Sequence, residues 1–345
     1  MAIYGVPLRP TFRLLNTHNA RGLTCVAPRG NRHAHKLCLT NTMANITTVP
    51  TKVFEGQKPG TSGLRKRVSV FEQEHYTENF VQCILQAIPG GAQGATLVVG
   101  GDGRYFSQPA VQKIVRIAAG NGVSKLIIGQ HGLLSTPAVS HLIRLRKATG
   151  GILLTASHNP GGPNADFGIK FNMENGGPAP EAVTNKIYQL STEIQSYRLV
   201  EGSDVDLSVI GSQKFANLDI EVIDSVHDYV TYLGKIFDFD AIRSFLQDGA
   251  FKVRFDALHG VTGPYARALF VERFGLDEST VQNCVPSPDF GGGHPDPNLT
   301  YAKSLVDAVE REGLDFGAAS DGDGDRNMIL GKGAFVKQSD RVAII

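Results

Sequence analysis

The chain has 345 residues, of which 41% are hydrophobic, so it is long enough to bury the cores of two domains. Its net charge of +1 gives no reason to expect nucleic acid or an anionic membrane surface as a partner. The four cysteines are scattered without a CxxC pair, which indicates neither a zinc site nor a disulfide framework. No apolar run approaches the roughly 20 residues that span a bilayer, so we expect no membrane partner.

Residues 1–46 are predicted to be a disordered segment that resembles a transit peptide. Basic residues recur from Arg9 to Lys52, whereas the first acidic residue is Glu55. Acid-poor, arginine-rich leaders with hydroxyl side chains are typical of organelle targeting. The hydroxyls here are all threonine, and a start at Met43 would omit the leader. The segment predicts a plastid (chloroplast) location if it is a transit peptide, with a cytoplasmic location as the alternative.

From Thr96 onward, short apolar runs alternate with segments of helical periodicity, which predicts an α/β sheet with crossover helices. Strands are expected at residues 96–100, 125–129 and 152–155. A helix is expected to begin with Thr136 as its cap residue, followed by Pro137, and to end at Gly150-Gly151. Residues 156–162 then leave from the carboxyl end of a strand, where open α/β sheets bind ligands.

The pattern restarts after a polar stretch, so we place a domain boundary after residue 220. The expected elements are a helix at 222–246, a strand at 251–255, helices at 264–274 and 301–312, and a strand at 316–319. The predicted domains are therefore 47–220 and 221–337. An apolar pattern begins near Ser339 and stops within 338–345, which suggests the start of a third domain in a truncated chain.

Three aspartates alternate with glycines in the segment Asp321-Gly-Asp323-Gly-Asp325. Alternate carboxylates of an extended loop can point to the same side, and their repulsion is relieved by a cation. A solvated turn is the simplest alternative, because Asp-Gly pairs form turns. A calcium EF-hand is the other, but Arg326 and Lys332 stand where it needs glycine and glutamate. All-oxygen ligands favour Mg²⁺ or Mn²⁺ over zinc.

Ser157 lies in the segment Thr-Ala-Ser-His-Asn-Pro-Gly-Gly that ends at Gly162, and we expect a tight, exposed loop to present its hydroxyl. Taken alone, Ser157 is more simply a turn hydroxyl, and His158 a hydrogen-bonding histidine. The sequence has no G-x-S-x-G elbow, Walker P-loop or G-x-G-x-x-G motif, which argues against nucleotide binding as the main activity.

Two basic segments offer further groups for an anion. Lys58 to Arg65 forms a glycine-bounded loop with two hydroxyls, and Lys170 follows Ser157 in the segment Gly-Ile-Lys-Phe-Asn. Each is, singly, more simply an ordinary surface loop. Together, however, the segments resemble the α-D-phosphohexomutase superfamily, whose motifs T-A-S-H-N-P-G-G-P-N, G-I-K-F-N, P-G-T-S-G-L-R and D-G-D-G-D-R they match. The resemblance covers about residues 47 to 345.

Two more segments, N-G-G-P-A-P-E at 175–181 and H-P-D-P-N-L-T at 294–300, resemble the branch of that family that acts on glucose phosphates. The resemblance implies two consecutive mixed-sheet α/β domains, with the third and fourth domains of the family absent. It also implies that phosphorylated Ser157 gives its phosphoryl group to the 6-hydroxyl of glucose 1-phosphate. The resulting glucose 1,6-bisphosphate turns around, returns its 1-phosphoryl group and leaves as glucose 6-phosphate.

The resemblance assigns the remaining roles. Mg²⁺ would be bound by Asp321, Asp323, Asp325 and an oxygen of phosphorylated Ser157. Phosphate would be contacted by Thr61, Ser62, Arg65 and Arg326, and His158 and Lys170 would assist proton transfer or orientation. Hexose phosphates are the expected partners of a monomer.

In the family, the third and fourth domains would recognise the sugar and its second phosphate. The sequence therefore leaves several alternatives to a complete mutase activity of this chain. They are a catalytically incompetent fragment, a non-catalytic scaffold paralogue, a leak of phosphate to water, or another phosphohexomutase such as a phosphomannomutase.

Overall fold

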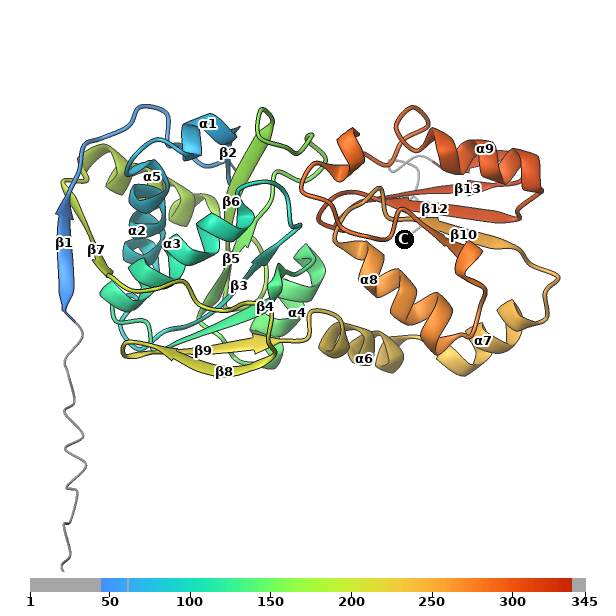
Figure 1. The fold of residues 1–345 in the computed structure, drawn as a ribbon, viewed down its shortest axis with the longest axis horizontal. Coiled ribbons are helices and arrows are strands. Elements are labelled where there is room, and N and C mark those ends of the chain that lie inside the picture. The colour runs from blue at the N-terminus through green and yellow to red at the C-terminus, as the bar shows by residue number, and fades with distance from the viewer. Residues whose placement is uncertain (1–44, 61, 337–345) are drawn as a thin grey trace, which may run out of the picture. The chain divides into compact units, whose positions relative to one another are not determined.

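The computed structural model describes residues 45–60 and 62–336 (Figure 1). Nearly all of the predicted leader, Thr61 and the predicted third-domain start at 338–345 lie outside the described residues. Among the helices that the structure describes, none combines the length and the hydropathy of a membrane span.

The first sheet is mixed and has seven strands in the order β2-β6-β5-β3-β4-β9-β8 (Figure 1). They are β2 (Leu64–Arg67), β3 (Thr96–Gly101), β4 (Lys125–Leu133), β5 (Gly150–Leu154), β6 (Asp166–Met173), β8 (Gly211–Phe215) and β9 (Leu218–Ile223). Neighbours among β5, β3, β4 and β9 are parallel, and β6, β2 and β8 join antiparallel. A separate antiparallel ribbon pairs β1 (Ile46–Pro50) with β7 (Ser196–Val200).

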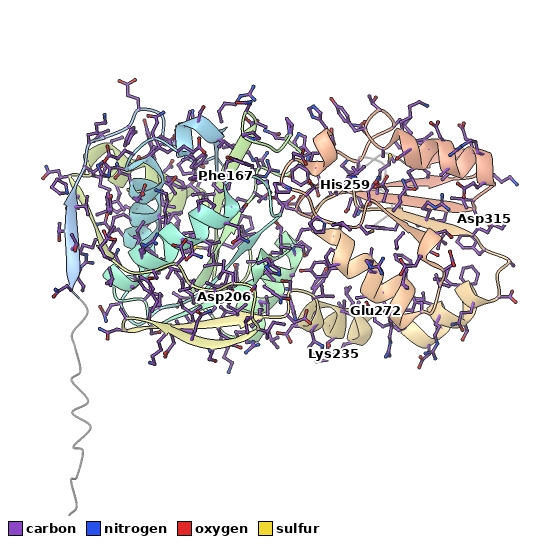
Figure 2. All side chains as sticks on the ribbon, viewed as in Figure 1. Phe167, Asp206, Lys235, His259, Glu272 and Asp315 are labelled. Carbon is purple, nitrogen blue, oxygen red and sulfur yellow. The ribbon has the colours of Figure 1, made fainter. Side chains whose placement is uncertain are left out.

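Helices bury both faces of this sheet. They are α1 (Val68–Phe71), α2 (Tyr76–Ala87), α3 (Ser107–Gly120), α4 (Thr136–Leu145) and α5 (Glu181–Glu193). Alternate residues of β3 enter different cores, as the period of a strand requires. Leu97 and Val99 join the large core, whereas Val98 joins the core around α4. In the large core, Phe71 and Phe106 pack edge-on against Phe167 of β6, which Figure 2 labels.

The ends of α4 differ from the prediction. Ser135, not Thr136, is the N-cap: its hydroxyl accepts a 3.2 Å hydrogen bond from the amide of Ala138. The predicted glycine stop is also wrong, because Gly150 and Gly151 are the first residues of β5. A Cβ on Gly151 would lie 2.9 Å from Ile143 Cδ1, so the glycine allows α4 to pack closely on the strand.

The second sheet has five strands in the order β11-β10-β12-β13-β14. They are β10 (Val253–Asp256), β11 (Val281–Gln282), β12 (Phe316–Ser320), β13 (Asn327–Gly331) and β14 (Ala334–Val336). Strands β11, β10 and β12 are parallel, and β13 and β14 continue antiparallel. The accompanying helices are α7 (Phe239–Gln247), α8 (Thr262–Ala266), a π-helix (Arg267–Arg273), α9 (Lys303–Glu312) and two short 3₁₀ turns (Glu278–Thr280 and Phe290–Gly292). Helix α6 (His227–Ile236) precedes them and packs against α4 of the first sheet.

The single helix expected at 222–246 is wrong. Its first residues complete β9, which pairs with β4 as far as Ile223, so the predicted boundary after residue 220 falls inside a strand. The chain leaves the helical conformation at Phe237, and Asp238 caps a new helix by accepting hydrogen bonds from two amides of α7. The limits of the two predicted domains stay predictions.

Candidate phosphoryl-transfer and metal site

Two loops leave from the carboxyl ends of strands in different sheets. The Ser157 loop follows β5, which ends at Leu154, and the aspartate loop follows β12, which ends at Ser320. Open α/β sheets place ligand sites at this end because the strands' carboxyl-terminal loops converge there. The two loops touch: Ser157 Oγ donates a 2.7 Å hydrogen bond to Asp321 Oδ2.

Ser157 is buried rather than exposed, contrary to the prediction, and only 1% of its surface is accessible. Its hydroxyl is covered by Asp321 and by Arg326, whose Nη2 also contacts Oγ. The backbone of Ser157 has φ of 57°, a left-handed conformation that costs free energy for any residue other than glycine. Surrounding groups must therefore hold the loop in place.

Arg104 is the main support of this loop, and it is 1% exposed. Its guanidinium donates to the carbonyl oxygens of Ser157 at 2.8 Å and of Asn159 at 3.3 Å, and pairs with Asp102 at 2.9 Å. Asp102 also accepts a 2.6 Å hydrogen bond from the hydroxyl of Thr155, whose oxygen accepts one from the amide of Ser157 at 2.7 Å. Both peptide groups of Ser157 are thus fixed through one buried ion pair.

Asp102, Arg104 and Thr155 were not predicted from the sequence as supporting residues. A signal was present for two of them, because Asp102 and Arg104 directly follow the predicted strand 96–100, at the edge where ligands bind. Their hydrogen bonds to the Ser157 loop could not be predicted, since they depend on β3 and β5 being neighbours in the sheet.

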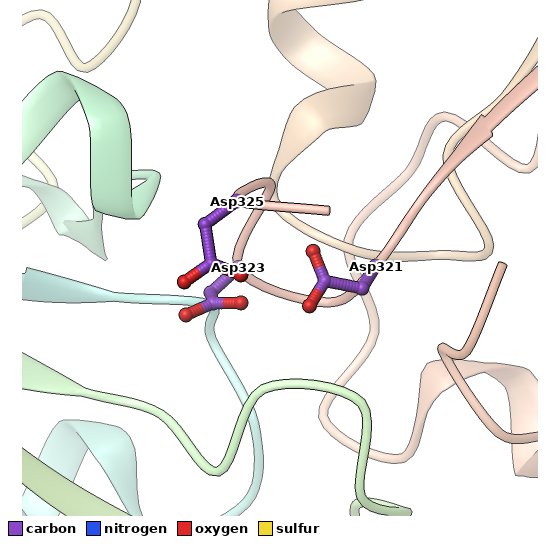
Figure 3. A group of neighbouring side chains, drawn as sticks. All are labelled: Asp321, Asp323 and Asp325. Carbon is purple, nitrogen blue, oxygen red and sulfur yellow. The ribbon is translucent and has the colours of Figure 1, made fainter. Parts of the chain in front are cut away.

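The three aspartates converge (Figure 3). Each of Asp321, Asp323 and Asp325 offers one oxygen, and these oxygens lie within 4.8 Å of one another. Asp321 and Asp323 are fully buried, and the side chain of Asp325 is 37% exposed. Gly324 has φ of 76°, so it supplies the left-handed turn that brings the carboxylates together.

Cationic side chains flank the aspartates but do not pair with every carboxylate oxygen. Lys170 Nζ lies 2.8 Å from Asp323 Oδ2 and 3.6 Å from Asp325 Oδ2, and Arg326 Nε lies 3.1 Å from Asp321 Oδ2. Asp323 Oδ2 also accepts a 2.7 Å hydrogen bond from the hydroxyl of Thr136. Asp323 Oδ1, in contrast, is buried and has no hydrogen-bond partner among the described residues.

The electrostatics of the aspartates favour an added cation. Burial, followed by the charges of Asp323 and Asp325, raises the pKa of Asp321 above its usual range. Burial acts in the same direction on Asp323, but its ion pair and hydrogen bond with Lys170 lower the pKa of that carboxyl. An unpartnered buried carboxylate oxygen is costly, and hard divalent cations prefer oxygen ligands. The donor set therefore fits such a cation.

The other predicted site residues differ in burial and in their hydrogen-bond partners. Burial lowers the pKa of Arg65, whose Nε is buried and has no hydrogen-bond partner among the described residues. His158 Nδ1 lies 2.6 Å from Arg326 Nη2. Ser62 is exposed, and in the described part of the chain no hydrogen bond joins its side chain to the site. Thr61 lies outside the described residues.

The chain matches two family models. They describe phosphoglucomutase/phosphomannomutase α/β/α domain I, over residues 56–198, and domain II of the same family, over residues 227–333. Among solved structures, pp63/parafusin (phosphoglucomutase) from Paramecium in its open form superposes with a TM-score of 0.83 at 45% identity, over 87% of this chain and 57% of that one.

Relatives named phosphoglucomutase are highly similar in sequence. The proteins from Schizosaccharomyces pombe and Aspergillus fumigatus are 61% and 60% identical over 87% of this chain, and phosphoglucomutase-1 from Bos taurus is 56% identical over 88%. The match covers 54%, 54% and 56% of these proteins, so the chain spans about half the length of the curated relatives it matches. With two domain models matched over most of its length, the chain belongs to the phosphoglucomutase/phosphomannomutase family.

Proposed function

We propose that this chain carries the phosphoryl-transfer centre of a phosphoglucomutase, with Ser157 as the phosphoryl carrier in the interconversion of glucose 1-phosphate and glucose 6-phosphate. One observation carries the proposal: Ser157 Oγ lies within hydrogen-bond distance of Arg326 and of Asp321. Asp321 belongs to the three-aspartate cluster, in which the buried Asp323 Oδ1 has no hydrogen-bond partner among the described residues. A turn hydroxyl would not require this combination of charges. The names of the relatives support the choice of reaction.

The surrounding side chains suit a phosphorylated Ser157. Arg326 contacts Oγ, so its guanidinium is placed to donate to phosphoryl oxygens, as arginine does at phosphate sites. Arg65 Nε, which has no hydrogen-bond partner in the described part of the chain, offers a further donor to an anion. Burial and then the charge of Arg326 lower the pKa of His158, which favours a neutral ring whose Nδ1 accepts from Arg326. Lys170 holds Asp323 and Asp325.

For the metal we propose Mg²⁺, held by Asp321, Asp323 and Asp325 together with an oxygen of phosphorylated Ser157. The donor set consists of oxygens only, and Asp323 Oδ1 is left for a cation by the groups around it. When bound, Mg²⁺ would offset negative charge on the transferring group.

Three finer points are proposals on the same family resemblance. Glucose 1,6-bisphosphate would be the intermediate and activator, the hexose phosphates would be the substrates, and the protein would act as a monomer. A plastid location rests on the composition of residues 1–46 alone.

The carrier role can be tested by intact-mass measurement after incubation with millimolar glucose 1,6-bisphosphate and Mg²⁺. We expect one added phosphate, which peptide fragmentation places on Ser157. Ser157→Ala should gain none, and Ser208→Ala, which changes a serine of an exposed turn, should gain one as the unaltered chain does. A folded chain that gains no phosphate on Ser157 would contradict the carrier role.

A further inference from the structure

Thr136 makes two contacts with the aspartate loop. Its amide donates a 2.8 Å hydrogen bond to the carbonyl oxygen of Asp323, and its hydroxyl donates a 2.7 Å hydrogen bond to Oδ2 of the same residue. Thr136 is the first residue of α4, so it stands on a helix of the first sheet while Asp323 follows a strand of the second. One residue therefore fixes both the backbone and the carboxylate of Asp323.

The helix does not need this hydroxyl. Ser135 caps α4 through its own side chain, so the hydroxyl of Thr136 is not needed as an N-cap acceptor. Thr136 is also only half-buried, and the one hydrogen bond that its hydroxyl makes among the described residues goes to Asp323. Its contribution is thus specific to the carboxylate.

Lys170 alone leaves the orientation of this carboxylate less defined. Its Nζ is shared between Asp323 at 2.8 Å and Asp325 at 3.6 Å, and a lysine ammonium is a point charge on a flexible stem. Threonine has a branched Cβ and few χ1 rotamers in a helix, so its hydroxyl defines a direction. Because both donors bind Oδ2, the oxygen that remains for a cation is Oδ1, which is buried and has no hydrogen-bond partner among the residues that the structure describes.

We infer that Thr136 is a positioning residue of the cation site: it holds Oδ2 of Asp323 so that Oδ1 is presented to the metal. The inference rests on the proposed metal site. Groups that orient a metal ligand through hydrogen bonds typically change metal affinity about 10–100-fold when removed. Replacing Thr136 with valine, which has nearly the same shape and no hydroxyl, should therefore weaken cation binding.

The test is a titration of the purified chain with Mn²⁺, followed by electron paramagnetic resonance of the free ion. We expect Thr136→Val to weaken Mn²⁺ binding about tenfold and Thr136→Ser, which keeps a hydroxyl, to restore most of the affinity. Ser135→Ala is the matched control at the same helix start. It should lower the thermal midpoint without changing the affinity, because its hydroxyl caps the helix and makes no hydrogen bond with Asp323 among the described residues.

Two results would overturn the inference in distinguishable ways. If Thr136→Val binds Mn²⁺ as tightly as the unaltered chain while Asp323→Asn does not bind it, the metal site stands and the positioning role of Thr136 is wrong. If Asp323→Asn binds Mn²⁺ as tightly as the unaltered chain, the proposed metal site is wrong and the role of Thr136 fails with it.

Discussion

Single buried residues decide whether the reactive groups of this site can keep their positions. Ser157 holds a left-handed backbone conformation, and its neighbouring peptide groups are fixed by Arg104 and Thr155. A residue in that conformation costs about 1–2 kcal/mol relative to a right-handed one. The Asp102–Arg104 pair, whose side chains are fully buried, therefore serves as a support for the Ser157 backbone.

Replacing Arg104 should destabilise the chain strongly. Arg104→Met leaves the carboxylate of Asp102 buried without its cation, and breaking a buried pair in this way costs about 3–5 kcal/mol. Arg116→Met is the matched control, because its ion pair with Asp204 is exposed and such pairs contribute about 0–1 kcal/mol. Urea unfolding followed by circular dichroism measures both. Equal losses of stability for the two variants would show that Arg104 is not a structural support.

The elements of the fold were predictable where periodicity was strong and neighbours were not needed. The strands predicted at 96–100 and 125–129 follow from apolar runs in the sequence, although the second strand continues to Leu133. The position of the aspartate loop follows from the strand predicted at 316–319, which precedes it. The separation of α6 from α7 was missed, because both helices share a helical apolar period and only Asp238 interrupts it. The burial of Ser157 was missed for another reason, since the residues that cover it come from the second sheet.

The interruption at Asp238 gives a prediction for α7. Its carboxylate accepts hydrogen bonds from the amides of Asp240 at 3.1 Å and Ala241 at 3.0 Å, so Asp238→Ala removes an N-cap. The expected loss is about 1 kcal/mol of unfolding free energy. Asp238→Ser keeps a capping oxygen and should lose much less. Chemical denaturation of the three proteins tests this, and equal stability of the alanine variant and the unaltered chain would exclude a capping role.

At the scale of the whole molecule, the candidate site links residues of two sheets. Ser157, Lys170 and Thr136 come from the first sheet and its helices, and all three contact the aspartate loop of the second. Each sheet has a core of its own, and the core around α4 also includes Val261 and Tyr265 from the second half of the chain. The polar contacts at the site therefore add to an apolar contact between the two halves. A ligand of the aspartate loop should therefore change the stability of the whole described part.

Adding Mg²⁺ should stabilise this chain, because a cation that binds only the folded state shifts the unfolding equilibrium by mass action. At a free concentration of 100 times the dissociation constant, the gain is about 2.7 kcal/mol. Thermal unfolding with and without Mg²⁺, at constant ionic strength set by sodium chloride, measures the shift.

Asp323→Asn should lose most of the Mg²⁺ shift, because the substitution removes a charge and a ligand oxygen from the three-aspartate cluster. Asp315→Asn changes a carboxylate outside that cluster, where its oxygen accepts from the amide of Lys252, and should keep the full shift. A Mg²⁺ shift of the same size in all three proteins would place the cation elsewhere on the chain.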